Sequence, residues 1–162
     1  MTTRSSAGIV LYRRPETGLE VLLAHPGGPL FRNRDAGHWS MPKGEPDENE
    51  PLIETARREF AEETGHPVPE GPVLPLGSIV QKGGKVVHAW AVEGDLDPAA
   101  ARSDTFEMEW PPRSGVTQSF PEIDRVEWFE RDEARRRLKP AQAPLLERLD
   151  AVLTDPAARG GD

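Results

Sequence analysis

Carboxylate side chains are concentrated in the segment between Gly44 and His66, whose sequence is GEPDENEPLIETARREFAEETGH. Its eight acidic residues and two arginines contribute −6 of the chain's formal net charge of −8. Three of the carboxylates, Glu59, Glu62 and Glu63, lie within five residues of one another. Oxygen ligands grouped in this way suit Mg²⁺ or Mn²⁺, ions that also engage substrate phosphates. The pattern therefore indicates a candidate metal site.

The spacing predicts a helix from about Pro51 to Thr64, because Asn49 and a first-turn proline are start signals and Gly65 is a stop signal. An apolar stripe on this helix is formed by Leu52, Ile53, Ala56 and Phe60. The three clustered carboxylates fall on and beside one edge of that stripe, so we expect them to be partly shielded from water. They also lie at the helix end whose dipole repels negative charge. A bound hard cation would remove that repulsion.

A solvated acidic helix face is the alternative interpretation, with Glu54, Arg58 and Glu62 forming an i,i+4 ladder. The wider spacing favours the metal site. Gly44, then Glu50, then the run REFAEETG that ends at Gly65 resemble the Nudix box of the Nudix hydrolases. Every fixed charged and glycine position of the box is filled, and the one departure is His66, which replaces the usual aliphatic residue.

The resemblance implies a site that cuts a phosphoanhydride in a nucleoside diphosphate linked to another group, using water and a divalent metal. Mg²⁺ is the expected metal, with Mn²⁺ as a substitute. Glu50 and Arg58 are expected to form an ion pair that braces the loop against the helix. The metal ligands that the box implies are Glu59, Glu62, Glu63 and the carbonyl group of Gly44.

The general base varies among Nudix enzymes and can lie outside the box. Glu62 is one candidate within the box. Glu122 is another, since it stands six residues before Trp128 in PEIDRVEW, a spacing similar to that of an outside-box glutamate in diadenosine tetraphosphate hydrolases. A solvated loop carboxylate is the alternative interpretation of Glu122, and Glu107 and Glu109 are competing candidates. The predicted catalytic set is Glu59, Glu62, Glu63 and Glu122.

Substrate binding requires cations for phosphate and aromatic rings for a base. Lys43 directly precedes Gly44, and this Pro-Lys-Gly approach resembles that of diadenosine and diphosphoinositol polyphosphate hydrolases. A lysine or arginine alone is more often a solvated surface charge, and a tryptophan at strand spacing is more often core. The further cation candidates are Arg32, Arg34, Lys82 and Lys85. The candidates for base stacking are Trp39, Trp90 and Trp110.

The 162 residues fit one globular domain, which we expect to span residues 1–155 and to be followed by a disordered tail at 156–162. The N-terminal sequence lacks the apolar run of a signal peptide, and no segment has the roughly 20 apolar residues of a membrane span. We therefore expect a cytoplasmic protein without membrane contact. The absence of cysteine excludes disulfides and thiolate catalysis, and a pI near 5.1 argues against general nucleic-acid binding.

The remaining pattern predicts strands around the central helix and further helices near the C-terminus. The expected strands are residues 6–12 and 19–24 as one hairpin, 39–44, then 73–81 and 85–93 as a second hairpin, 105–110, and 124–129. The expected later helices are residues 130–138 and 144–153. A loop is expected at 25–38 and an irregular stretch after Trp110. This order fits an α/β fold, and the resemblance implies an α/β/α sandwich with a mixed sheet and a loop-helix-loop Nudix box.

The sequence therefore favours a Mg²⁺-dependent pyrophosphohydrolase that acts on a nucleoside triphosphate or a dinucleoside polyphosphate. The expected partner is this small-molecule substrate, and the resemblance also allows a homodimer. Three alternatives remain: a nucleotide-binding sensor module of the same fold, a hydrolase of diphosphoinositol polyphosphates, and an acidic interaction protein whose match is accidental. The intact set of box carboxylates favours the enzyme.

Overall fold

A mixed six-stranded sheet forms the centre of the fold in the computed structural model, which describes residues 4–154. Its strand order is β4-β5-β1-β2-β8, with β3 paired to β1. β1 runs parallel to β5 and antiparallel to β2, so the mixed sheet expected from the sequence is confirmed. The strands are β1 (Ser5–Arg13), β2 (Glu20–Pro26), β3 (Lys43–Gly44), β4 (Val73–Val80), β5 (Val86–Glu93) and β8 (Ile123–Glu130).

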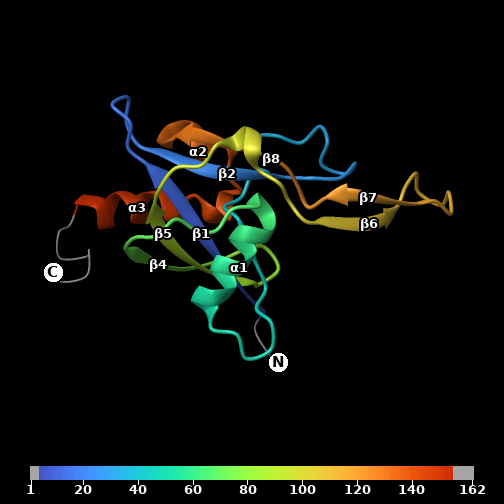
Figure 1. Ribbon diagram of the computed structural model, residues 1–162, viewed down its shortest axis with the longest axis horizontal. Helices are drawn as coiled ribbons and strands as arrows, with labels where there is room; N and C mark the ends of the chain where they lie inside the picture. Colours follow the sequence, from blue (N-terminus) through green and yellow to red (C-terminus); the bar gives the residue numbers. More distant parts are fainter. Residues whose placement is uncertain (1–3, 155–162) are drawn as a thin grey trace.

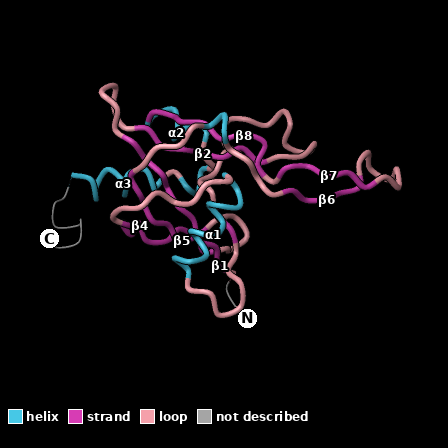
Figure 2. Tube along the Cα trace, in the orientation of Figure 1, coloured by secondary structure: helices cyan, strands magenta, loops and turns pink. Residues whose placement is uncertain are grey.

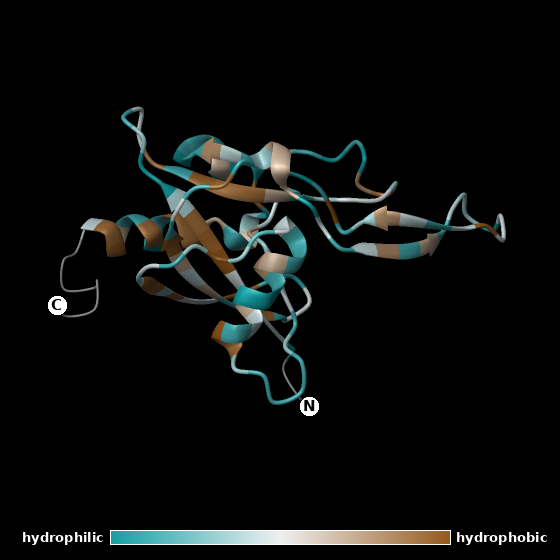
Figure 3. Cartoon of the chain, viewed as in Figure 1, coloured by the Kyte–Doolittle hydropathy of each residue, from teal (hydrophilic) through white to brown (hydrophobic). Residues whose placement is uncertain are grey.

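Helices cover both faces of this sheet (Figure 1). Alternate residues of β1 point to opposite faces of the sheet. Residues 6–12 of this strand are all buried, so both faces are covered at β1. On one face Ile9 clusters with Phe60 of α1 (Leu52–Thr64), and on the other Val10 clusters with Leu149 of α3 (Pro144–Thr154). A short helix, α2 (Arg131–Arg137), joins the second cluster through Ala134. This arrangement is the expected α/β/α sandwich, and Figure 3 shows the apolar residues along the central strands.

The predicted helix over the acidic segment and both predicted hairpins are present. α1 ends at the glycine that the sequence predicts as its stop signal: Gly65 has a positive φ of 75° and its N–H donates to the carbonyl of Ala61. The two C-terminal helices also form close to their expected bounds. Two short 3₁₀ turns, Pro98–Ala100 and Pro140–Gln142, complete the helical elements in the described part of the chain.

Two expectations about strands were wrong. The strand predicted for residues 39–44 is confined to β3, and Trp39 and Ser40 make only isolated bridges. The stretch predicted to be irregular contains a strand, β7 (Thr117–Pro121), which pairs with β6 (Thr105–Glu109) in a separate two-stranded sheet. Most residues of β7 are exposed, so its sequence lacks the alternation of buried and exposed residues that would reveal a strand. Figure 1 shows this β6–β7 hairpin projecting from the body of the fold.

The loop between β2 and β3 is long and mostly irregular (Figure 2). It is anchored at His25, whose buried ring contacts Asp124 through Nδ1 and donates through Nε2 to the carbonyl of Arg34. Trp39 fixes the far end, because its fully buried ring packs edge-on against Phe129. Trp39 is therefore a core residue and does not stack on a base.

Within residues 4–154, no helix is long and apolar enough to cross a membrane. The predicted domain end at residue 155 and the predicted tail at 156–162 lie outside the described residues.

Candidate active site

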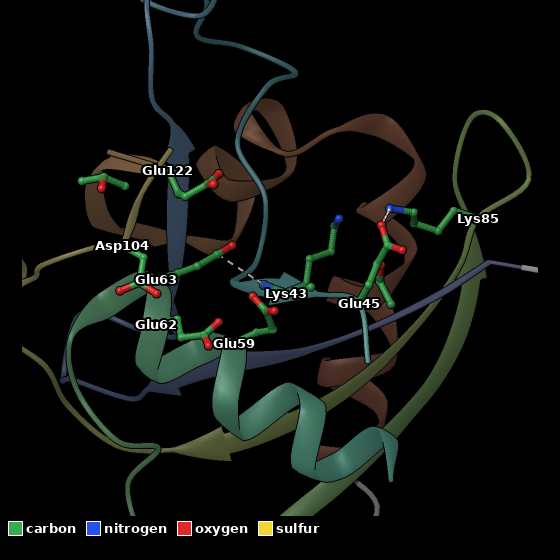
Figure 4. A pocket seen from close by; sticks show the side chains of 11 residues that line it. Lys43, Glu45, Glu59, Glu62, Glu63, Lys85, Asp104 and Glu122 are labelled. Carbon is green, nitrogen blue, oxygen red and sulfur yellow. Dashed lines mark hydrogen bonds and ion pairs between the residues drawn. The ribbon is translucent and has the colours of Figure 1, made fainter. Parts of the chain in front are cut away.

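A cavity of about 520 Å³ opens between the C-terminal half of α1, the loop at β3 and the base of the β6–β7 hairpin. The acidic side chains of α1 and of the hairpin base form one side of it, and Lys43, Lys85 and Glu45, the partner of Lys85, form the other (Figure 4). Six separate parts of the chain contribute, so the fold gathers groups that are far apart in the sequence. The lining residues are Ser6, Lys43, Gly44, Glu45, Glu59, Glu62, Glu63, Lys85, Asp104, Thr105 and Glu122.

Gly44 lies against the helix because β3 pairs with β1 at Ala7. A Cβ atom at this position would overlap the carboxyl group of Glu59. Only glycine therefore lets the loop backbone approach the helix so closely. This contact brings the loop and the Glu59 carboxylate to the same wall of the cavity.

Arg58 holds the acidic loop and the helix together. Its guanidinium donates from Nε and Nη2 to the two oxygens of Glu50, each at 2.9 Å, and from Nη2 to the carbonyl of Glu45 at 3.0 Å. Its Nη1 donates to Glu59 at 2.9 Å and to Glu62 at 3.1 Å. The bidentate pair with Glu50 joins the loop to the helix, and Nη1 bridges two of the clustered carboxylates.

Glu63 is the most deeply placed carboxylate of the cluster. Burial, followed by repulsion from Glu59, raises the pKa of Glu63 to about 8. Its Oε1 accepts from the backbone N–H of Lys43 at 3.4 Å (Figure 4). Burial also raises the pKa of Glu59, whose side chain is 17% exposed, whereas Glu62 is 38% exposed. The expected shielding of these carboxylates from water is therefore present, and it is weaker for Glu62 than for Glu59 and Glu63.

Lysines oppose these carboxylates. Burial, followed by the positive charges of Lys139 and Lys85, lowers the pKa of Lys43 to about 8. Lys85 forms an ion pair with Glu45 at 3.1 Å. A smaller cavity adjoins the first one at Lys43, Glu63 and Glu122, and Lys139 lies on its wall.

The base of the β6–β7 hairpin carries two more carboxylates into the cavity, Asp104 and Glu122. The backbone N–H of Asp104 donates to the Glu62 carbonyl at 2.9 Å, and the N–H of Glu122 donates to the Asp104 carbonyl at 2.8 Å. The N–H of Gly27 donates to the carbonyl of Glu122 at 2.9 Å, so the Glu122 backbone is hydrogen-bonded through both its N–H and its carbonyl. Carbonyls at a helix C-terminus need such partners, so this hairpin base also completes α1.

The donor set fits a hard divalent cation. The carboxylates of Glu59, Glu62 and Glu63 and the close backbone of Gly44 offer oxygen ligands only, as Mg²⁺ and Mn²⁺ prefer. In the part of the chain that the structure describes, no three acidic or histidine side chains already form a closed metal-binding cluster. Arg58 bridges Glu59 and Glu62 instead, so a metal ion would compete with this guanidinium for carboxylate oxygens.

The structure brings most predicted site residues together, but three of the predicted cations lie elsewhere. Arg32 and Arg34 are exposed in the loop after β2 and line none of the cavities described above. Lys82 is exposed on the β4–β5 turn and lines a separate, mainly apolar cavity together with Lys139. Their roles in substrate binding stay predictions.

Sequence reasoning missed several residues that line the two adjoining cavities: Ser6, Glu45, Asp104, Thr105 and Lys139. Asp104 and Lys139 are separated from the box by 39 residues or more of chain. The need of the α1 C-terminus for hydrogen-bond partners signals that some segment must pack there, but it does not say which one.

Comparisons with known proteins agree with this geometry. A model of the family described as NUDIX domain matches residues 2–149. The fold is similar to a C. elegans Ap4A hydrolase in a binary complex, with 23% identity, a TM-score of 0.63, and coverage of 93% of this chain and 98% of that chain. It is also similar to the NUDIX domain of Shewanella oneidensis NrtR complexed with ADP ribose, with 20% identity, a TM-score of 0.67, and coverage of 95% and 90%.

A third similar structure is a mutT/nudix family protein from Listeria innocua, with 22% identity, a TM-score of 0.62, and coverage of 95% of this chain and 96% of that chain. No match to a curated protein was found. At these identities the solved structures establish a shared fold.

Replacement of Glu50 by Gln should destabilise the protein at neutral pH, because the bidentate pair with Arg58 would be lost. The hydrogen bonds from Arg58, followed by that from the Asp47 backbone, lower the pKa of Glu50 from 4.5 to about 2. A lowered carboxylate pKa stabilises the fold above about pH 4.5 and loses that effect as the pH falls toward about 2. The stability gap between wild type and Glu50→Gln should therefore shrink over this interval.

Urea unfolding over a pH series measures this gap. The matched control is Glu48→Gln, since Glu48 is exposed on the same loop and makes no ion pair within the described residues. A gap that stays constant from neutral to acid pH would show that Glu50 does not act through its charge.

Proposed function

The chain belongs to the NUDIX domain family of acid-anhydride hydrolases, and we propose that it is a Mg²⁺-dependent pyrophosphohydrolase of nucleoside triphosphates or dinucleoside polyphosphates. The observation that carries this proposal is the cavity in which the Glu59, Glu62 and Glu63 carboxylates oppose Lys43 and Lys85. An acidic wall for cations and a basic wall for phosphate oxygens are both needed before water can approach a polyphosphate.

In this proposal Glu59, Glu62, Glu63 and the Gly44 carbonyl hold the metal. A bound divalent cation neutralises phosphate oxygens and lowers the pKa of a coordinated water. The Lys43 ammonium binds an oxygen of the phosphate chain from the opposite wall. Arg58 and Glu50 keep the helix and the loop in register, so the carboxylates stay on one wall of the cavity. The site therefore orients the anhydride before the chemical step.

Hydrolysis adds one water molecule across a P–O–P bridge. A new bond forms between the water oxygen and the attacked phosphorus, the bridging P–O bond breaks, and the leaving phosphate departs with the bridging oxygen. The water proton passes to a carboxylate at the cavity. We assign this role to Glu122, which lies on the hairpin base with its backbone held on both sides. Glu62 is the alternative base, as the more exposed of the clustered carboxylates.

A nucleotide-binding module without turnover is the competing function. The similarity to the NrtR domain complexed with ADP ribose is the observation that favours it. The complete set of box carboxylates favours the hydrolase. Diphosphoinositol polyphosphates remain an alternative substrate class because of the Pro42-Lys43-Gly44 approach to the box.

Incubation with Mg²⁺ and a substrate panel tests the proposed function. The panel comprises nucleoside triphosphates, dinucleoside polyphosphates, ADP-ribose and diphosphoinositol phosphates. We expect turnover of at least one nucleotide polyphosphate, and a loss of about 100-fold or more in Glu63→Gln, because a neutral amide is a poor metal ligand. The Glu63→Gln variant should keep its fold, since burial already favours the neutral form of Glu63.

If the protein binds a nucleotide but turns over no member of the panel, the hydrolase assignment is wrong and the sensor-module assignment is supported. Unchanged activity in Glu63→Gln would remove Glu63 from the metal site. Circular dichroism of the variant separates loss of chemistry from loss of fold.

Replacement of Glu122 by Gln should lower kcat by about 100-fold or more with little change in KM, since a general base acts in the transition state. Steady-state kinetics on the best panel substrate measures both parameters. The matched control is Glu127→Gln on β8, where a partly exposed carboxylate lies outside both adjoining cavities. A kcat close to that of wild type in Glu122→Gln would assign the base to Glu62.

A further inference from the structure

Each of the four lysines of the chain lines at least one of three cavities: the main cavity, the one that adjoins it, and the separate, mainly apolar one that shares Lys139 with the second. Lys43 and Lys85 lie on the wall of the main cavity, and Lys43 is shared with the adjoining one. Lys139 lies on that adjoining cavity and borders the mainly apolar one beyond it, together with Lys82. The chain has sixteen arginines, and none of those within residues 4–154 lines the main cavity. The basic wall thus continues past the main cavity as far as Lys139.

Two half-buried ammonium groups among these lysines have no ion-pair partner within residues 4–154. Lys85 is paired with Glu45, whereas Lys43 and Lys139 form no ion pair with any residue between 4 and 154. Both side chains are half-buried, and burial, followed by the charge of Lys85, lowers the pKa of Lys139 against the attraction of Glu63. Half-buried like charges without partners are destabilising. A bound anion would remove that destabilisation.

Lys139 is held in a defined position by its backbone. Its N–H donates to the carbonyl of Trp39 at 2.9 Å, and its carbonyl accepts from the N–H of Gln142 at 2.9 Å. The neighbouring Leu138 is buried in the core, and Pro140 fixes the backbone that follows. The point from which this ammonium extends is therefore fixed relative to Lys43.

A hydroxyl group on the main cavity also lacks a partner. Ser6 is fully buried, it lines the cavity, and its Oγ has no hydrogen-bond partner among the described residues. Buried hydroxyls are nearly always hydrogen-bonded in native proteins. Ser6 therefore offers a further donor to an oxygen of a bound anion.

We propose that Lys139 extends the phosphate-binding wall formed by Lys43, Lys85 and Ser6, and so selects substrates with a chain of three or more phosphates. This inference rests on the proposed function and names its substrate class. Lys43 lines both the main cavity and the adjoining one, whereas Lys139 does not line the main cavity that holds the acidic wall. In this proposal a diphosphate at the acidic wall binds Lys43 and not Lys139. A longer polyphosphate chain supplies the additional negative charge that Lys139 binds.

Kinetics of Lys139→Gln on two substrates test this selection, with diadenosine tetraphosphate as the long substrate and ADP-ribose as the diphosphate. We expect KM for the tetraphosphate to rise about tenfold, the effect of one lost charge-assisted hydrogen bond. KM for ADP-ribose should change by less than about threefold. Lys139→Arg should retain the tetraphosphate KM, because it keeps the charge. The matched control is Arg136→Gln, which removes a positive charge from a side chain that is exposed outside the cavities, and it should leave both KM values unchanged.

Equal effects on both substrates, or no effect on either, would overturn the selection by Lys139. Calorimetric binding of inorganic tripolyphosphate tests the lysine wall without any need for turnover. Failure of the wild type to turn over either substrate would count against the proposed function and not against the wall. Tenfold weaker tripolyphosphate binding by Lys139→Gln, with Arg136→Gln unchanged, supports the wall. Equal binding by all three proteins refutes it.

Discussion

The concentration of like charge at the C-terminal end of α1 is the constraint on which the rest of the structure depends. Glu59, Glu62 and Glu63 lie where the helix dipole is unfavourable and where water is partly excluded. Within the described residues, Arg58 is the one cation that forms ion pairs with this cluster, and it reaches Glu59 and Glu62 only. Glu63 instead accepts a hydrogen bond from the backbone N–H of Lys43, and burial, followed by repulsion from Glu59, raises its pKa.

The neighbouring elements are arranged around that cluster. β3 and Gly44 bring the loop backbone against Glu59, and Glu50 ties the loop to Arg58. The base of the β6–β7 hairpin supplies backbone donors to the last carbonyls of α1 and adds the carboxylates of Asp104 and Glu122. On the opposite wall Lys85 is paired with Glu45, whereas Lys43 and, beyond it, Lys139 form no ion pair with any described residue. A polyphosphate bound with a divalent cation would satisfy both walls together.

Local patterns in the sequence predicted much of this arrangement. The bounds of α1 and the two hairpins of the main sheet follow from short-range signals, namely apolar periodicity, turn residues and a C-terminal glycine. The pairing of Glu50 with Arg58 was implied by the resemblance to the Nudix box, and the structure contains it. The β6–β7 hairpin was missed in part because its second strand is exposed. Asp104 and Lys139 were missed because only the tertiary fold brings them to the box. Arg32 and Arg34 are close to the box in sequence, but both are exposed and neither lines the main cavity or the adjoining one.

Metal binding in the absence of any substrate tests the role of the carboxylate cluster most directly. A ligand that binds only the native state stabilises it by about 2.7 kcal/mol at 100 times its Kd. Mg²⁺ or Mn²⁺ should therefore raise the thermal unfolding midpoint of the wild type and of the control variant Glu54→Gln, whose side chain is exposed on the first turn of α1. It should leave the midpoint of a Glu59→Gln, Glu63→Gln double variant unchanged. An equal rise in all three proteins, or no rise in the wild type, would contradict a metal site at the end of this helix.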